Sequence, residues 1–168
     1  MAYIMKYLDY RNKIKSGDLL AWTYRGWRSW YDFKIQMVRV FTQSEFAHVG
    51  VAWEYGDRLF VIESVTPYIR IVPLSNLLPA YWVSVSAPWS VETERFVLSL
   101  VGKAKYSQTE AVKAFLSNNN LENGAWQCAE LVHALWLKDK VPLFPLKDTP
   151  SAVVAAAMEH SPLVLLEP

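Results

Sequence analysis

Apolar residues in the first half of the chain follow the short or alternating pattern that is typical of β-strands. Strands are predicted at residues 19–22, 47–53, 59–65, 70–74 and 81–85. The segment that separates the second strand from the third contains Gly56, which favours a β-hairpin. A last strand is predicted at residues 163–166. The middle of the chain is therefore expected to be rich in sheet.

Helical spacing of apolar residues is found on both sides of these strands. It predicts helices at residues 30–41, 91–101, 111–116 and, in a segment of small residues, 151–157. The most regular pattern starts near Asn123 or Gly124. Its apolar face is formed by Cys128, Leu131, Val132, Leu135 and Trp136. This pattern predicts a helix with Cys128 on its buried face.

Length and charge narrow the class of protein. A chain of 168 residues, 52% of them hydrophobic, suffices for one core, so a single domain spanning 1–168 is expected. The net charge of +1 without a long basic run argues against a nucleic-acid partner. Lys6 and Asp9 interrupt the apolar start, so no signal peptide is expected. The uncharged stretch 71–91 contains three prolines and predicts strands and loops rather than a transmembrane segment.

Cys128 is the only cysteine, which excludes an internal disulfide and a multi-thiolate metal site. It is either a small core hydrophobe or a reactive thiol. If Asn123 caps the helix, Cys128 lies within about its first turn and a half, where the helix dipole and free N–H groups favour a thiolate. The same N–H groups would suit an oxyanion hole. The position alone leaves both interpretations open.

Three histidines are candidates for a base that activates the thiol. His133 follows Cys128 by five residues, about 140° around the helix axis, and therefore faces elsewhere. His160 lies in a proline-flanked tail. His48 belongs to a predicted strand, on one face with Gly50. A strand histidine by itself is more often a hydrogen-bonded structural residue than a catalyst, so the strand does not assign its role.

Glu63 is a carboxylate inside an apolar strand, where its charge needs a partner. If the hairpin turn is centred between Tyr55 and Gly56, His48 lies directly opposite Glu63. A register shifted by two pairs His48 with Val65 and keeps Glu63 on the histidine's face, whereas an odd-length loop moves it away. Glu63 is then either the orienting carboxylate of a catalytic triad or one half of a cross-strand ion pair.

Short motifs follow one another along the chain. They are SGDLL (16–20), TQSEFAHVGV (42–51), VIES (61–64), VPL (72–74) and CAELV (128–132), together with GKAKY (102–106) and TPS (149–151). In order and spacing, from about residue 16 to 155, they resemble the circularly permuted NlpC/P60 papain-like proteins, the YiiX-like group related to lecithin retinol acyltransferase. Ala47 and Ala129 stand where serine is common in that family. The second departure alters the surroundings of the nucleophile, but neither removes a catalytic group.

The resemblance implies an α+β domain with a papain-like fold, in which an antiparallel sheet packs against the nucleophile's helix. Carried over to this chain, it makes Cys128 the nucleophile, His48 the general base and later acid, and Glu63 the residue that orients the imidazole. The thiolate would attack an amide or ester carbonyl and form a thioester. No metal or cofactor is expected.

Eight tryptophans are more than a core of this size usually needs. The Trp22–Trp30 region combines aromatic residues with two arginines. This region either lines a substrate cleft or partner surface, or packs the sheet against the helices. Tyr24, Tyr106 and Gln127 are further candidates for residues around the cleft.

We therefore expect a cysteine hydrolase of amide or peptide bonds, with bacterial cell-wall peptides as substrates because relatives in the resembled superfamily cleave them. An acyl or lipid substrate, as in the acyltransferase relatives, would use the same triad. A protein of another class, a non-enzymatic binding or virion-structural module, would keep the fold without the chemistry. The absence of a signal peptide fits a cytoplasmic protein, or a phage protein that is carried in a virion or released by lysis.

Overall fold

The computed structural model describes residues 3–23, 46–65, 68–87, 89–102, 128–143, 145 and 148–168. The helices predicted at residues 30–41 and 111–116 lie outside these ranges.

A seven-stranded mixed sheet forms the centre of the molecule. Its strands are β1 (Tyr3–Lys6), β2 (Leu19–Trp22), β3 (His48–Tyr55), β4 (Arg58–Val65), β5 (Tyr68–Pro73), β6 (Ala80–Val83) and β7 (Val164–Glu167). Their order across the sheet is β1-β7-β6-β2-β3-β4-β5. The resemblance implied an antiparallel sheet, and this needs one correction: β1 runs parallel to β7, while the other paired strands are antiparallel.

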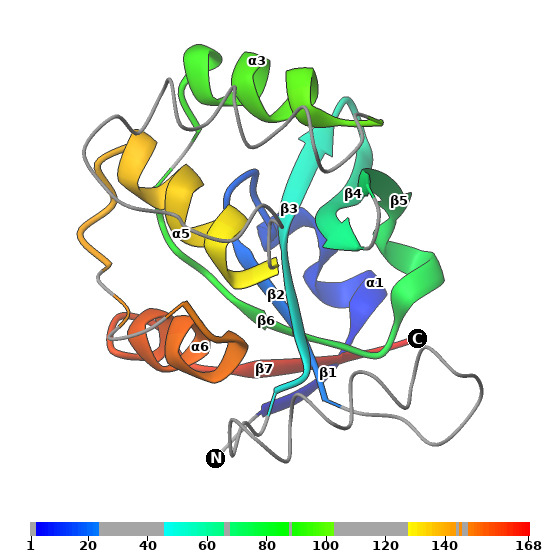
Figure 1. Cartoon of the computed structure of the whole chain (residues 1–168). Coiled ribbons are helices and arrows are strands. Elements are labelled where there is room, and N and C mark those ends of the chain that lie inside the picture. The colour runs from blue at the N-terminus through cyan, green and yellow to red at the C-terminus, as the bar shows by residue number, and fades with distance from the viewer. Residues whose placement is uncertain are drawn as a thin grey trace, which may run out of the picture.

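Helices cover both faces of the sheet (Figure 1). On one face lie α3 (Val91–Leu100), α5 (Cys128–Lys138) and α6 (Pro150–Met158), and with the sheet they enclose the larger core, which includes the fully buried Trp136. On the other face, α1 (Tyr7–Tyr10) and the 3-10 helix η1 (Arg11–Lys13) accompany a smaller core around Ile14 and Trp82. A second 3-10 helix, η2 (Leu74–Leu77), leads from β5 toward β6.

The elements predicted from apolar spacing are confirmed wherever the structure describes them, with shifts of one or two residues at their ends. The described residues between 71 and 90 form the end of β5, η2, β6 and loop segments, so strands and loops are confirmed there and η2 is an addition. No helix among the described residues is long and apolar enough to cross a bilayer. The sequence pattern did not predict β1 and α1, because each has only four residues and most of their apolar side chains are at least partly exposed.

The hairpin of β3 and β4 has the second of the two registers considered for it. Tyr55 pairs with Arg58, so the turn consists of Gly56 and Asp57, and the register centred one residue earlier is wrong. Gly56 adopts a φ of +62°, a conformation that suits glycine and that the rejected register would have required of Tyr55. Continued along the strands, this pairing sets Gly50 opposite Glu63.

Candidate active site

His48 and Glu63 meet across the β3–β4 hairpin. The Nε2 atom of His48 lies 2.6 Å from Oε2 of Glu63. The contact is diagonal, because the residue opposite Glu63 is Gly50. A Cβ atom at Gly50 would lie only 3.2 Å from the Cβ of Glu63 and 3.1 Å from the carbonyl oxygen of Ile62. Glycine at this position therefore leaves room for the glutamate side chain to reach the imidazole.

The second carboxylate oxygen of Glu63 binds Arg70. These two residues are direct cross-strand partners on β4 and β5. The Nε and Nη2 atoms of Arg70 lie 2.7 and 2.6 Å from Oε1 of Glu63. Burial of Glu63 raises the pKa of its carboxyl, but the hydrogen bonds and positive charges of His48 and Arg70 bring that pKa below its ordinary value. Glu63 is therefore a buried, ionised carboxylate with one partner on each oxygen.

Trp22 supports the imidazole from the other side of β3. It is the cross-strand partner of His48 on β2, and the two ring centroids are 5.6 Å apart. The indole N–H of Trp22 donates a hydrogen bond of 2.8 Å to the carbonyl of Leu77, which fixes the indole in place. The imidazole is thus held by a carboxylate at one nitrogen and by an aromatic ring beside it.

Cys128 is the first described residue of α5, and its side chain is partly buried against the larger core. The His48 side chain and the backbone N–H groups of Val49 and Ala129 are the neighbours that lower the pKa of the Cys128 thiol. Since Nε2 of His48 is bound to Glu63, Nδ1 is the nitrogen available to the sulfur. The helix thus brings the thiol to the first residues of β3. Asn123, the expected cap of this helix, lies outside the described residues.

The protonation states of Cys128 and His48 are coupled. Burial raises the pKa of the Cys128 thiol, but the hydrogen bond from His48, its positive charge and the two backbone N–H groups bring it below the ordinary value. Burial lowers the pKa of His48, but hydrogen bonds to Cys128 and Glu63, together with their negative charges, raise it to about 10. Both shifts favour a thiolate–imidazolium pair near neutral pH.

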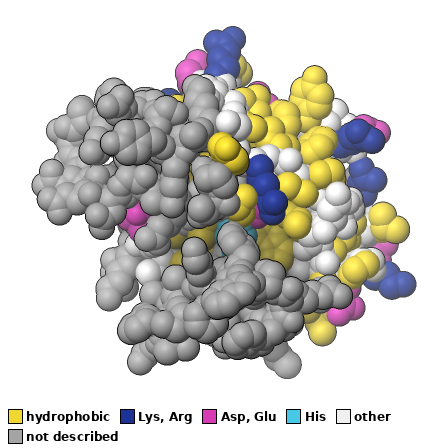
Figure 2. Space-filling model, turned by 45° about the vertical axis from the view of Figure 1, so that its right-hand side comes forward, with side chains coloured by type: hydrophobic (Ala, Val, Ile, Leu, Met, Phe, Trp, Pro, Cys, Tyr) yellow, Lys and Arg dark blue, Asp and Glu magenta, His cyan; other side chains and the backbone are white. Residues whose placement is uncertain are grey.

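The site opens to the surface on the histidine side. The side chain of His48 is 21% exposed and that of Arg70 is 51% exposed, whereas Glu63 is only 3% exposed. Figure 2 shows histidine and basic side chains among apolar ones on one face of the described part of the molecule. The imidazole is therefore partly exposed to solvent, while the carboxylate that binds it is shielded from water.

Other residues singled out from the sequence stand apart from this site or outside the described ranges. Nδ1 of His133 lies 2.7 Å from Oδ1 of Asp148, so this histidine joins α5 to the segment before α6. Tyr24, Tyr106 and Gln127 lie outside the described residues, as does most of the Trp22–Trp30 region.

Arg70 and Gly50 are site residues whose roles were not predicted. A signal for Arg70 exists in the sequence, because adjacent predicted strands carry one acidic and one basic residue that a hairpin could pair. The structure makes this pair directly, between Glu63 and Arg70.

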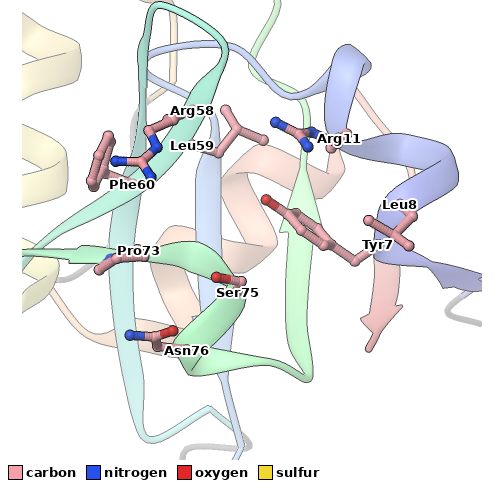
Figure 3. A pocket seen from close by; sticks show the side chains of 9 residues that line it. All are labelled: Tyr7, Leu8, Arg11, Arg58, Leu59, Phe60, Pro73, Ser75 and Asn76. Carbon is pink, nitrogen blue, oxygen red and sulfur yellow. The ribbon is translucent and has the colours of Figure 1, made fainter.

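A separate hollow of about 430 Å³ lies between the α1–η1 segment and the β4–η2 region (Figure 3). It is lined by Tyr7, Leu8, Arg11, Arg58, Leu59, Phe60, Pro73, Ser75 and Asn76. Neither His48, Glu63 nor Cys128 contributes to it. The candidate active site is therefore a different part of the surface.

Comparison with known proteins identifies the fold. No family model and no curated protein matches the sequence. Among solved structures, the chain is similar to the metalloprotein yiiX from Escherichia coli O157:H7, with 16% sequence identity and a TM-score of 0.53 over 91% of this chain and 89% of that one. At this identity the likeness shows the fold alone, and it confirms the permuted papain-like fold implied by the motifs.

That protein is called a metalloprotein, so the possible metal ligands of this chain are of interest. Among the residues that the structure describes here, no group of three or more histidine, cysteine, aspartate or glutamate side chains is arranged to hold a metal ion. His48 and Glu63 are paired with each other, with Nε2 of His48 2.6 Å from Oε2 of Glu63.

Proposed function

We propose that this protein is a papain-like cysteine hydrolase of amide or peptide bonds. In it, Cys128 is the nucleophile, His48 the general base and acid, and Glu63 the carboxylate that orients the imidazole. Two observations support the proposal: Nε2 of His48 lies 2.6 Å from Oε2 of the buried Glu63, and His48 lowers the pKa of the Cys128 thiol. Nucleophile, base and orienting group in this order are the arrangement that activates a thiol.

The first half of the reaction forms a thioester. The Cys128 thiolate attacks the carbonyl carbon of the substrate, and the developing oxyanion is stabilised by N–H groups at the start of α5. The protonated His48 donates its Nδ1 proton to the leaving amine as the carbon–nitrogen bond breaks. The acyl group is then bonded to sulfur, and the imidazole is neutral.

The second half releases the acyl group. The Nδ1 atom of neutral His48 takes a proton from a water molecule while that water attacks the thioester carbonyl. Collapse of the intermediate breaks the carbon–sulfur bond, releases a carboxylic acid and restores the thiolate. Throughout both halves, Glu63 accepts the hydrogen bond of the Nε2 proton and so keeps Nδ1 directed at the reacting atoms.

The proposed substrates are bacterial cell-wall peptides, because the motifs of the chain resemble those of NlpC/P60 proteins. An ester or thioester of a fatty acid presents the same carbonyl to the thiolate, so an acyl substrate is the alternative outcome of a substrate test. Mass spectrometry of peptidoglycan fragments and of lipid extracts, incubated with the protein or with Cys128→Ala, distinguishes the two. If neither panel differs between the two proteins, both substrate classes are excluded.

Thiol reactivity tests the catalytic arrangement without any assumption about substrate. We expect iodoacetamide to label Cys128 quickly at neutral pH in the folded protein, because His48 and two backbone N–H groups lower the pKa of the thiol. Loss of the imidazolium in His48→Ala should slow labelling by about 10-fold or more, the effect of raising a thiol pKa by at least one unit. Labelling that requires denaturant and ignores His48 would instead support a non-enzymatic module that retains the fold.

A further inference from the structure

Arg70 ends the row of polar contacts that begins at Cys128. We propose that Arg70 is a positioning residue of this active site, which acts through Glu63 to hold the His48 imidazole in its catalytic orientation and tautomer. The inference rests on the proposed function, since it assigns a role in that same reaction. It goes beyond the triad by making the site a set of four charged groups on α5, β3, β4 and β5.

The geometry fixes the Glu63 carboxylate from one side. Two nitrogens of the Arg70 guanidinium converge on Oε1 at 2.7 and 2.6 Å, which leaves Oε2 for Nε2 of His48 at 2.6 Å. A rotation of the carboxylate would break both sets of contacts. The planar guanidinium has fixed donor directions that a lysine ammonium lacks. Direct cross-strand pairing of Glu63 and Arg70 anchors this arrangement in the sheet.

Charge balance gives Arg70 a second effect. Glu63 is 3% exposed, and a buried carboxylate is costly unless it is paired. In the resting site the charges alternate, from the Cys128 thiolate through the His48 imidazolium and Glu63 to the Arg70 guanidinium, so they cancel. Without Arg70, two anions would share the single imidazolium.

The positive charge of Arg70 matters most after the leaving group has departed. His48 has then given up its Nδ1 proton, and Arg70 is the cation that remains bound to Glu63. An ionised Glu63 keeps the remaining ring proton on Nε2, so Nδ1 is free to take a proton from water. A protonated Glu63 would donate to Nε2 and leave the ring proton on Nδ1, which is the wrong tautomer for a base. Arg70 therefore preserves the tautomer that hydrolysis of the thioester requires.

The test is the pH dependence of Cys128 alkylation in Arg70→Met and Arg70→Lys. Arg70→Met removes the positive charge of the guanidinium and so weakens the network of ionised side chains. The acid limb of its pH–rate profile should therefore move to higher pH by about one unit. Alkylation would then be about 10-fold slower at pH values below the limb. Arg70→Lys should recover much of the shift. Arg58→Met is the matched control, because Arg58 is an exposed arginine at the other end of β4 and should leave the profile unchanged.

A double substitution shows whether Arg70 acts through Glu63. In a Glu63→Gln background, Arg70→Met should cause little further shift, because the carboxylate that Arg70 positions is absent. An equal shift in both backgrounds would mean that the guanidinium acts directly, which would overturn the inference. Circular dichroism of each variant verifies that the sheet is intact.

Failure of this inference and failure of the proposed function give different results. If the wild-type thiol labels quickly and depends on His48, but Arg70→Met keeps the wild-type profile, the role of Arg70 is wrong and the hydrolase proposal stands. If wild-type labelling is slow and independent of His48, the hydrolase proposal fails and the role of Arg70 fails with it.

Discussion

At the scale of single residues, the site depends on a glycine as well as on its charged side chains. Glu63 reaches His48 diagonally past Gly50, so the missing Cβ atom at that position is part of the arrangement. The sequence predicted that Glu63 shares the face of His48, because both even registers place it there. It did not predict the diagonal contact, since the turn position decides which residue stands between them.

Gly50→Ala tests this dependence. The new Cβ atom would lie 3.2 Å from the Cβ of Glu63 and 3.0 Å from a methyl carbon of Val61, so Glu63 must shift and its contact with His48 weakens. We expect alkylation of Cys128 at neutral pH to slow several-fold, with a small loss of stability. Gly56→Ala, in an open turn, is the control for a glycine outside the site. Wild-type labelling rates in Gly50→Ala would contradict the close-packing argument.

Glu63 also predicts a dependence of stability on acid pH. Its folded pKa is lower than its ordinary value of 4.5, so the ionised carboxylate contributes stability above that pH. The contribution is lost as the pH falls from 4.5 toward the folded pKa. Urea unfolding between about pH 5 and 3 should therefore show a shallower loss of unfolding free energy in Glu63→Gln than in the wild type. Equal slopes in both proteins would exclude this effect.

At the scale of elements, the local spacing of apolar residues predicted helices and strands, but it did not predict which distant strands pair with each other. Ser90 and Thr149 cap α3 and α6 through N–H groups three residues later in the chain, so these helix starts can be predicted from local sequence. By contrast, β1 forms by pairing with β7, near the other end of the chain. Its four residues carry no strong alternation, because three of their side chains are exposed.

One contact between elements is suited to measurement. The Oδ1 atom of Asp139, just after α5, accepts hydrogen bonds from the Ser90 backbone, the Ser90 hydroxyl and the Thr93 hydroxyl at 3.2, 2.7 and 2.8 Å. Asp139→Ala removes the acceptor that these three donors share, and we expect the unfolding free energy to fall by about 2–3 kcal/mol. Asp139→Asn keeps an amide oxygen and should lose less. A change below about 0.5 kcal/mol in the alanine variant would show that α3 docks independently of this aspartate.

At the scale of the whole molecule, the candidate site and the ends of the described chain occupy different parts of one sheet. His48, Glu63 and Arg70 lie on β3, β4 and β5, whereas β1 and β7 lie toward the opposite edge. Predicting this arrangement required the order of strands across the sheet, which the spacing of apolar residues does not contain. The ordered motifs indicated a permuted papain-like fold, but they did not predict the order of the strands across the sheet.

Deletion of residues 1–6 tests the separation of the two regions. It removes β1 and exposes the backbone of β7 as a new sheet edge, so thermal stability should fall and self-association should rise. The labelling rate of Cys128 in the remaining folded protein should stay close to that of the wild type. Loss of thiol reactivity in a variant whose circular dichroism is unchanged would show that the two regions are coupled.

The order of the site residues along the chain matters during synthesis. Because His48 and Glu63 precede Cys128, the ribosome releases the base and its carboxylate long before the cysteine. The sulfur that emerges later keeps the ordinary pKa of a thiol until α5 docks beside Val49 and the imidazole. Under the proposed function, nascent chains and misfolded copies consequently carry an unactivated thiol, and thiolate reactivity arises only when α5 has docked on the sheet.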